Sequence, residues 1–195
     1  MLYDRDFHKS IENDEYPQAV RVGEYFSGIH AITPFTRFLD FGCSTGMYLR
    51  EIKLKLPHVE SKGFEFAEDA VNIAVCEDVV QCDLTQPIAL EKMTEGKTFG
   101  LCLEVLEHIS DDSWEPVLRN ITRLCDKVMF SAAVPGQGGT GHINCRDKID
   151  WIRRFHSLGW VVDLDHTKHF MEFIAKGYHM RWLHNNVIVF VPGVL

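Results

Sequence analysis

Apolar and polar positions alternate along this chain in two rhythms, and the two rhythms predict its secondary structure. Short apolar runs bounded by glycine, proline or polar residues are typical of buried strands, whereas apolar residues spaced three and four apart indicate helices. After a polar lead, we expect an N-terminal helix that begins near Pro17, because proline suits a first helical turn. The other predicted elements are strands from residue 38 and at residues 60–66, 79–82, 99–103, 127–133, 160–164 and 186–191, with helices after residue 46 and at residues 67–76, 111–125, 147–157 and 167–183.

The predicted order of elements favours an α/β fold. Strands that alternate with helices of these lengths pair in parallel through right-handed crossovers. At 195 residues the chain suits one domain, and its 46% hydrophobic and 25% charged residues are ordinary for a globular protein.

Neither a membrane span nor a secretory signal is evident in the sequence. No apolar run reaches the roughly 20 residues that cross a bilayer, and the first residues lack a basic segment followed by an apolar core. The six cysteines are scattered without a Cys-x-x-Cys pair. We therefore expect reduced thiols, a cytoplasmic protein and no zinc site.

The charge balance disfavours nucleic acid as a partner. The chain has 20 basic and 28 acidic residues, and even its densest basic clusters are short, such as the pair Arg153 and Arg154. Proteins that bind phosphate backbones usually carry a basic stripe instead. The composition leaves the oligomeric state open.

The segment after the first predicted strand carries the clearest chemical signal. The strand ends at Asp40, and small residues then alternate through Gly42 and Gly46 before a helix. Such a turn lies at the carboxyl ends of parallel strands, which is the ligand side of these sheets. Glycine lets main-chain amides approach a ligand, and the following helix points its free N–H groups at the same place. The alternative is a purely structural glycine turn.

Two motifs carry a resemblance to a known family. Residues 40–46, Asp-x-Gly-x-Ser-x-Gly, resemble the first motif of class I S-adenosylmethionine-dependent methyltransferases, with Ser44 at its middle glycine. The Gly-x-Gly-x-x-Gly spacing of nicotinamide-binding folds is absent. Residues 104–108, Glu-Val-Leu-Glu-His, resemble the Glu-Val-x-Glu-His pattern after the fourth strand of a group of small-molecule methyltransferases, although Gly100 replaces the Asp that commonly opens that strand.

The resemblance implies a fold, a cofactor and a division of the chain. The fold would be a Rossmann-like, doubly wound seven-stranded sheet, mostly parallel with the last strand antiparallel, and with helices on both faces. The cofactor would be S-adenosylmethionine, with S-adenosylhomocysteine as product. Residues 1–195 would form one methyltransferase domain, with an N-terminal helical cap at 1–33, a cofactor-binding core at 34–135 and a substrate-side part at 136–195.

Positions that match the family imply the contacts with the cofactor. Glu65, at the predicted end of the second strand, would accept hydrogen bonds from both ribose hydroxyls. Asp83 would accept one from the adenine amino group. Each acid has an alternative role, Glu65 as a solvated strand end and Asp83 as a turn or helix cap. The implied cofactor-binding residues are Asp40, Gly42, Cys43, Ser44, Gly46, Glu65, Phe66, Asp83, Leu84, Leu103 and Glu104.

Catalysis would need an aligned acceptor and, for a protonated nucleophile, a base. A histidine has an ordinary pKa of about 6.5 and can take that proton. His142 follows a loop with four glycines at residues 136–141, and His108 ends the second motif, so we expect one of them to be the base. The alternatives are a flexible surface loop and the start of a surface helix. The expected substrate-binding residues are Asn144, Trp151 and Trp182.

No metal site is expected, because His166 and His169 are spaced as on one helix face and lack a third ligand. We expect an enzyme that methylates an oxygen atom of a small-molecule acceptor with a histidine base. The alternatives are a protein or nucleic-acid acceptor, a non-catalytic subunit that binds S-adenosylmethionine, and a nicotinamide-dependent oxidoreductase.

Overall fold

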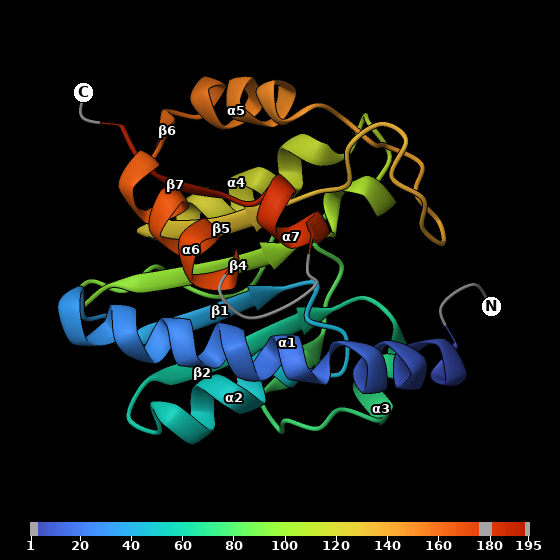
Figure 1. Cartoon of the computed structure of the whole chain (residues 1–195), viewed down its shortest axis with the longest axis horizontal. Coiled ribbons are helices and arrows are strands. Elements are labelled where there is room, and N and C mark those ends of the chain that lie inside the picture. The colour runs from blue at the N-terminus through green and yellow to red at the C-terminus, as the bar shows by residue number, and fades with distance from the viewer. Residues whose placement is uncertain (1–3, 176–180, 194–195) are drawn as a thin grey trace.

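A computed structural model describes residues 4–175 and 181–193 of the chain. These residues form one seven-stranded sheet with helices on both sides (Figure 1). The strands are β1 (Arg37–Phe41), β2 (Glu60–Glu65), β3 (Val79–Gln81), β4 (Thr98–Leu103), β5 (Lys127–Ser131), β6 (Trp160–Val162) and β7 (Ile188–Pro192). Their order is β3-β2-β1-β4-β5-β7-β6. β1 to β5 are parallel, whereas β7 runs antiparallel to both β5 and β6. The expected mostly parallel sheet with an antiparallel last strand is confirmed.

The sheet separates two apolar clusters, because successive strand residues face opposite sides. Phe38 packs with Phe26 and the other buried residues of helix α1 (Arg5–Ile32), whereas Leu39 lies in one cluster with Leu118 of helix α4 (Trp114–Leu124). Helices α1, α2 and α6 therefore cover one face, and α4 and α5 cover the other. The helices are α1 (Arg5–Ile32), α2 (Met47–Lys55), α3 (Glu68–Asn72), α4 (Trp114–Leu124), α5 (Lys148–Ser157), α6 (Leu164–Ala175) and α7 (Arg181–Asn186), with a 3-10 turn η1 (Leu106–His108).

The strand order reverses between β1 and β4, and this reversal positions the site. From β1 the chain proceeds to β2 and β3 on one side of the sheet, and from β4 to β5 on the other side. The loops that leave the carboxyl ends of β1 and β4 therefore diverge. Ligands of open α/β sheets bind in the crevice at such a switch point.

The N-terminal helix begins earlier than the sequence predicts. It starts at Arg5, runs for 28 residues and continues through Pro17, although proline in a helix interior costs about 3 kcal/mol. Asp4 caps its start by accepting a hydrogen bond from the Phe7 main-chain nitrogen at 3.0 Å. The expected start near Pro17 is wrong, because the polar lead is itself helical and is held by contacts with distant residues.

Other predicted boundaries are also shifted, among them the ends of the strands predicted at 127–133, 160–164 and 186–191. The helix predicted at 67–76 ends at Asn72, because the Val75 main-chain nitrogen instead donates to the Thr45 carbonyl at 2.8 Å. The helical stretch predicted at 167–183 is represented by α6, which begins earlier, and by the first residues of α7. Residues 176–180 of that prediction lie outside the described part of the chain.

Candidate active site

The turn after β1 has the left-handed backbone that its small residues allow. The φ angles of Gly42, Ser44 and Gly46 are 78°, 49° and 81°. A Cβ at Gly42 would lie 2.5 Å from Cγ2 of Val105, so the turn also packs tightly against the segment after β4. Ser44 occupies the middle position in the same left-handed region, where glycine is favoured and short polar residues are tolerated.

Glu65 links this turn to the end of β2. Its Oε2 accepts a hydrogen bond from the Ser44 main-chain nitrogen at 2.8 Å, and its Oε1 accepts one from the Ala67 nitrogen at 2.7 Å. A carboxylate has about four lone-pair positions, so each oxygen retains the capacity to accept a second donor. The geometry is suited to a pair of neighbouring hydroxyl groups.

Asp40 is an acid buried without a full set of partners. It is 2% exposed, and its Oδ2 has no hydrogen-bond partner within residues 4–175 and 181–193. Burial and the neighbouring Glu65 carboxylate raise the pKa of Asp40 to about 8. A buried carboxyl with an open oxygen is a place where a cation would be stabilised.

The first turns of α1 cover the glycine turn. The buried His8 places its Nδ1 2.8 Å from the Ser44 hydroxyl, and Figure 1 shows this part of α1 extending towards α3. Burial lowers the pKa of His8, against the opposing effect of Glu65, Asp69 and Asp4. No local pattern predicts this contact, since His8 and Ser44 are 36 residues apart.

Three polar side chains meet beyond the end of β4. Glu104 has a positive φ of 53°, and its Oε2 accepts a hydrogen bond from Nε2 of Gln137 at 2.7 Å. Asn186 donates through Nδ2 to Oε1 of Gln137 at 2.8 Å and to Oε1 of Glu104 at 3.3 Å. The left-handed backbone therefore aims Glu104 at the glycine-rich loop and at α7. Neither Gln137 nor Asn186 stands out in the sequence, because each is an ordinary amide until the fold brings it to an acid.

Glu107 is not part of an exposed helix. It is fully buried in η1, and its Oε1 accepts a hydrogen bond from the Ala133 main-chain nitrogen at 3.1 Å. Burial and the neighbouring Glu104 raise the pKa of Glu107. Its carbonyl oxygen accepts hydrogen bonds from the nitrogens of Ile143 and Asn144. Glu107 thus anchors both the segment after β5 and the end of the glycine-rich loop, and the surface-helix alternative is wrong for it.

The two candidate bases lie beside Glu107 and beside each other. The ring centroids of His108 and His142 are 5.0 Å apart in an edge-to-face arrangement. His108 Nδ1 lies 3.2 Å from the Gly141 carbonyl oxygen, and His142 Nδ1 lies 3.3 Å from the Gln137 carbonyl oxygen. Burial lowers the pKa of His108 despite the carbonyl contact that opposes this shift. A Cβ at Gly139 would overlap the His142 ring, so this glycine makes room for the imidazole.

The predicted adenine contacts follow the next strand. Asp83 comes two residues after β3, beside the end of β2, because Glu65 and Gln81 are register partners. Oδ1 of Asp83 accepts hydrogen bonds from the nitrogen and hydroxyl of Thr85 at 2.9 and 2.7 Å, as a turn cap does. Phe66 is 70% exposed, whereas Leu84 is buried in the core. Asp40 is the second-last residue of β1, Glu65 is the last residue of β2 and Asp83 follows β3, so the three acids lie at the carboxyl ends of three adjacent strands.

The remaining predicted residues differ in how accessible they are. Leu103 and Trp182 are partly buried against the cluster on the α1 side of the sheet. Trp151 is 1% exposed and packs against Phe130 with ring centroids 5.4 Å apart, so it lies in the core on the α5 side. Cys43 also points inward, and only its main chain belongs to the turn. Asn144 holds the loop by donating through Nδ2 to the Ile109 carbonyl at 3.1 Å.

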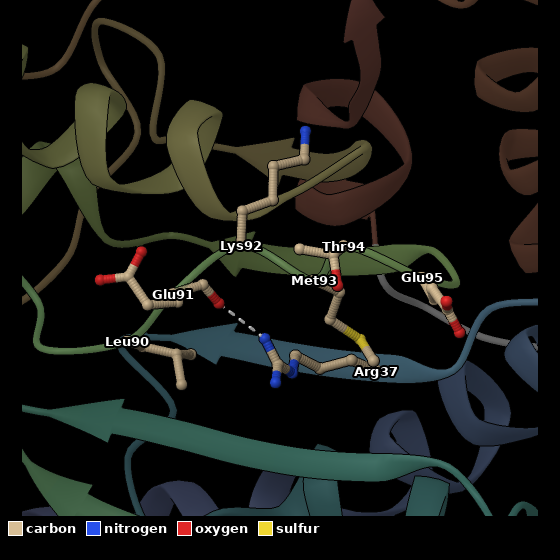
Figure 2. Close-up of a pocket in the computed structure, with 7 residues that line it drawn as sticks. All are labelled: Arg37, Leu90, Glu91, Lys92, Met93, Thr94 and Glu95. Atoms are coloured by element: carbon tan, nitrogen blue, oxygen red, sulfur yellow. Dashed lines mark hydrogen bonds between the residues drawn. The ribbon is translucent and has the colours of Figure 1, made fainter.

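An open hollow lies by the amino end of β1, away from the carboxyl ends of the strands (Figure 2). Arg37, the first residue of β1, donates through Nη1 to the Glu91 carbonyl oxygen at 2.9 Å and so holds the rim of this hollow. Its other lining residues are Leu90, Lys92, Met93, Thr94 and Glu95. It contains none of the strand-end acids, which lie at the carboxyl ends of the strands. Across the described ranges, the structure has no helix with the length and apolarity that crossing a membrane requires.

No protein-family model and no curated protein matches the chain in sequence. Solved structures do match it. The plantazolicin methyltransferase BpumL, solved with a pentazolic desmethylPZN analogue and S-adenosylhomocysteine, superposes with a TM-score of 0.65 at 12% identity, covering 97% of this chain and 91% of that one. DesVI of Streptomyces venezuelae gives 0.64 at 12% identity, with 96% of each chain covered.

An O-methyltransferase from a trans-AT PKS multienzyme of Brevibacillus brevis, solved with S-adenosylhomocysteine, gives a TM-score of 0.58 at 14% identity. The match covers 82% of this chain and 67% of that one. At such identities the likeness establishes the fold. The chain has the fold of class I S-adenosylmethionine-dependent methyltransferases, as its two motifs imply.

Proposed function

We propose that this protein is an S-adenosylmethionine-dependent methyltransferase that methylates an oxygen atom of a small-molecule acceptor. The observation that carries the proposal is the gathering of Asp40, Glu65 and Asp83 at one edge of a methyltransferase-fold sheet, around a left-handed glycine turn. Several solved neighbours of this fold hold S-adenosylhomocysteine, and two are named O-methyltransferases.

The acids divide the cofactor among them in this proposal. Asp40 faces the cationic methionine end, because its open oxygen lacks a counter-charge. Glu65 accepts the two ribose hydroxyls with the lone pairs that Ser44 and Ala67 leave available. Asp83 accepts the adenine amino group, and Phe66 and Leu84 flank the ring. The main chain of Gly42, Cys43, Ser44 and Gly46 completes the contact.

The sulfonium lies by Leu103 and Glu104 in this arrangement. S-adenosylmethionine supplies an activated methyl group, so the protein has to align the acceptor oxygen and remove its proton. His142 is the proposed base, with His108 beside it as the second candidate. Asn144 and Trp182 are the proposed lining of the acceptor pocket, and the buried Trp151 supports it from the core.

Calorimetry tests the cofactor assignment. S-adenosylmethionine and S-adenosylhomocysteine are expected to bind, and nicotinamide dinucleotides are not. Glu65→Ala should weaken S-adenosylhomocysteine binding by about 1.5–3 kcal/mol, the size of a hydrogen bond to a charged group. Glu68→Ala, which removes an exposed acid at the start of α3, is the matched control. No binding of either adenosyl ligand would refute the proposal.

Methyl transfer tests the base. With a panel of small hydroxylated acceptors and radiolabelled cofactor, His142→Ala should slow transfer by about a hundredfold or more and leave S-adenosylhomocysteine affinity unchanged. His156→Ala, at an exposed position of α5, is the control. Unaltered turnover in His142→Ala would exclude His142. Cofactor binding without turnover on any acceptor would favour the non-catalytic subunit.

A further inference from the structure

Three potential metal ligands meet beside the proposed cofactor site. One carboxylate oxygen of Glu107 and one ring nitrogen each of His108 and His142 all lie within 4.8 Å of one another. Two of these residues belong to η1, and the third follows the glycine-rich loop, so only the fold brings them together. The sequence predicts no metal site because it shows no local ligand spacing for this set.

The main chain orients both imidazoles in the way that metal-binding histidines are oriented. His108 Nδ1 and His142 Nδ1 each lie within hydrogen-bond distance of a main-chain carbonyl oxygen, that of Gly141 and that of Gln137. A carbonyl accepts only, so a hydrogen bond to it requires the proton on Nδ1 and leaves the lone pair on Nε2. The Cys145 sulfur also lies 3.8 Å from His142 Nδ1. Histidine ligands of metals are usually held by such a bond from the other ring nitrogen.

Glu107 supplies the carboxyl oxygen that such a site requires. Its side chain is fully buried, and the Ala133 nitrogen donates only to Oε1. Oε2 is buried without a hydrogen-bond partner in the described part of the chain. A buried carboxyl oxygen of this kind is costly unless a donor or a cation satisfies it.

We propose that Glu107, His108 and His142 bind a divalent transition-metal ion of the zinc type. Two imidazoles and one carboxylate are a common ligand set for such ions, with bonds of about 2.0–2.2 Å. Ligand atoms around one ion are then about 3–3.5 Å apart, so the set has to contract from its present spacing. The four glycines at residues 136–141 give the loop before His142 the backbone freedom for this movement.

The role of the ion rests on the proposed function. Three protein ligands leave a position open for the acceptor, and a bound ion lowers the pKa of an acceptor hydroxyl. The hydroxyl proton passes to water, the oxygen attacks the methyl carbon, and the carbon–sulfur bond breaks with its electron pair remaining on sulfur. His142 would then hold the ion and would not itself take the proton.

The test is cobalt binding to tag-free, chelator-treated protein. Co²⁺ titration should give visible d–d absorption bands that saturate at one ion per chain, and Zn²⁺ should displace it. His142→Ala and Glu107→Gln should weaken Co²⁺ binding about a hundredfold or more, whereas His156→Ala should leave it unchanged. Gly139→Ala provides a further variant that keeps all three ligands, and it should weaken binding because the new Cβ displaces the His142 ring.

Folding of each variant is checked by S-adenosylhomocysteine affinity, which the metal ligands should not alter. The absence of stoichiometric Co²⁺ binding, or equal binding in His142→Ala, would overturn the metal site and leave the methyltransferase proposal standing. Co²⁺ binding without any binding of adenosyl ligands would support the metal site and refute the methyltransferase proposal. Turnover that survives chelation would assign the proton to His142 and overturn the role of the ion.

Discussion

Asp40 is held in an environment that opposes its charge. Burial and Glu65 raise its pKa to about 8, whereas an Asp in an unfolded chain titrates near 3.9. An acid whose folded pKa is raised destabilises the fold progressively as pH rises from about 4 to about 8. The nearby thiols of Cys43 and Cys102 stay protonated over this range, because burial raises their pKa well above its ordinary value.

Replacing this acid should therefore stabilise the protein and weaken its cofactor binding. Asp40→Asn has nearly the same shape without the charge, and it should raise the free energy of unfolding by about 2–4 kcal/mol at pH 8 and by little at pH 4. Denaturant unfolding at both pH values measures the difference. The wild-type affinity for S-adenosylmethionine should increase up to about tenfold per pH unit between pH 6 and 8, because a cation at Asp40 requires the ionised form.

Calorimetry of Asp40→Asn is the control for that titration, since the variant should bind more weakly and with a flat pH profile. A wild-type profile that is equally flat would remove Asp40 from the methionine end of the cofactor. Equal stabilities of the two proteins at pH 8 would contradict the raised pKa itself.

Single residues also show where sequence analysis stops. The proximity of Asp40 and Glu65 could be predicted, because parallel strands have their carboxyl ends on the same side of the sheet and each acid lies at or next to the end of its strand. The burial of Glu107 could not, since it depends on Ala133 and on the loop after it. The proposed metal ligands could not be predicted for the same reason: Glu107 and His108 are neighbours in η1, and nothing in the sequence indicates that His142 meets them.

Among the elements, α1 departs most from its prediction. Pro17 is a valid local signal for a helix start, yet the helix begins at Arg5. Asp4, three residues before the Phe7 nitrogen that it caps, is the signal that could have located the start. The contact between His8 and the Ser44 hydroxyl at 2.8 Å adds long-range support that no local rule contains.

This contact makes the first turns of α1 a cover whose closure should depend on His8. His8→Ala removes one hydrogen bond, worth about 0.5–1.5 kcal/mol, so amide hydrogen exchange at residues 5–11 should become about two- to tenfold faster. Lys9→Ala, at an exposed position of the same turn, should leave exchange unchanged. S-adenosylhomocysteine should slow exchange in both proteins. Equal exchange in the two variants would show that the cover is held by other contacts.

At the scale of the molecule, the strand order was predictable only through the family resemblance. A period of two tells which side chains of a strand face the core, and it does not tell which strands are neighbours. The resemblance supplied the antiparallel last strand. In the structure that strand, β7, is inserted between β5 and β6, so the last strand of the chain completes the interior of the sheet while α1 lies across one face.

The two ends of the chain should therefore respond differently to truncation. A chain that stops at Asn186 lacks β7, so one edge of β5 is left unpaired and β6 loses the strand it pairs with. It also lacks Phe190, a fully buried ring stacked 3.9 Å from that of Phe155. This chain should show no cooperative unfolding and should aggregate through the exposed strand edge.

Removal of residues 1–16 leaves every strand in place and should retain a cooperative transition while losing S-adenosylhomocysteine affinity. Circular dichroism during denaturant titration compares the two, and a chain ending at Asn186 that unfolds at the wild-type midpoint would show that the sheet does not depend on its inserted strand.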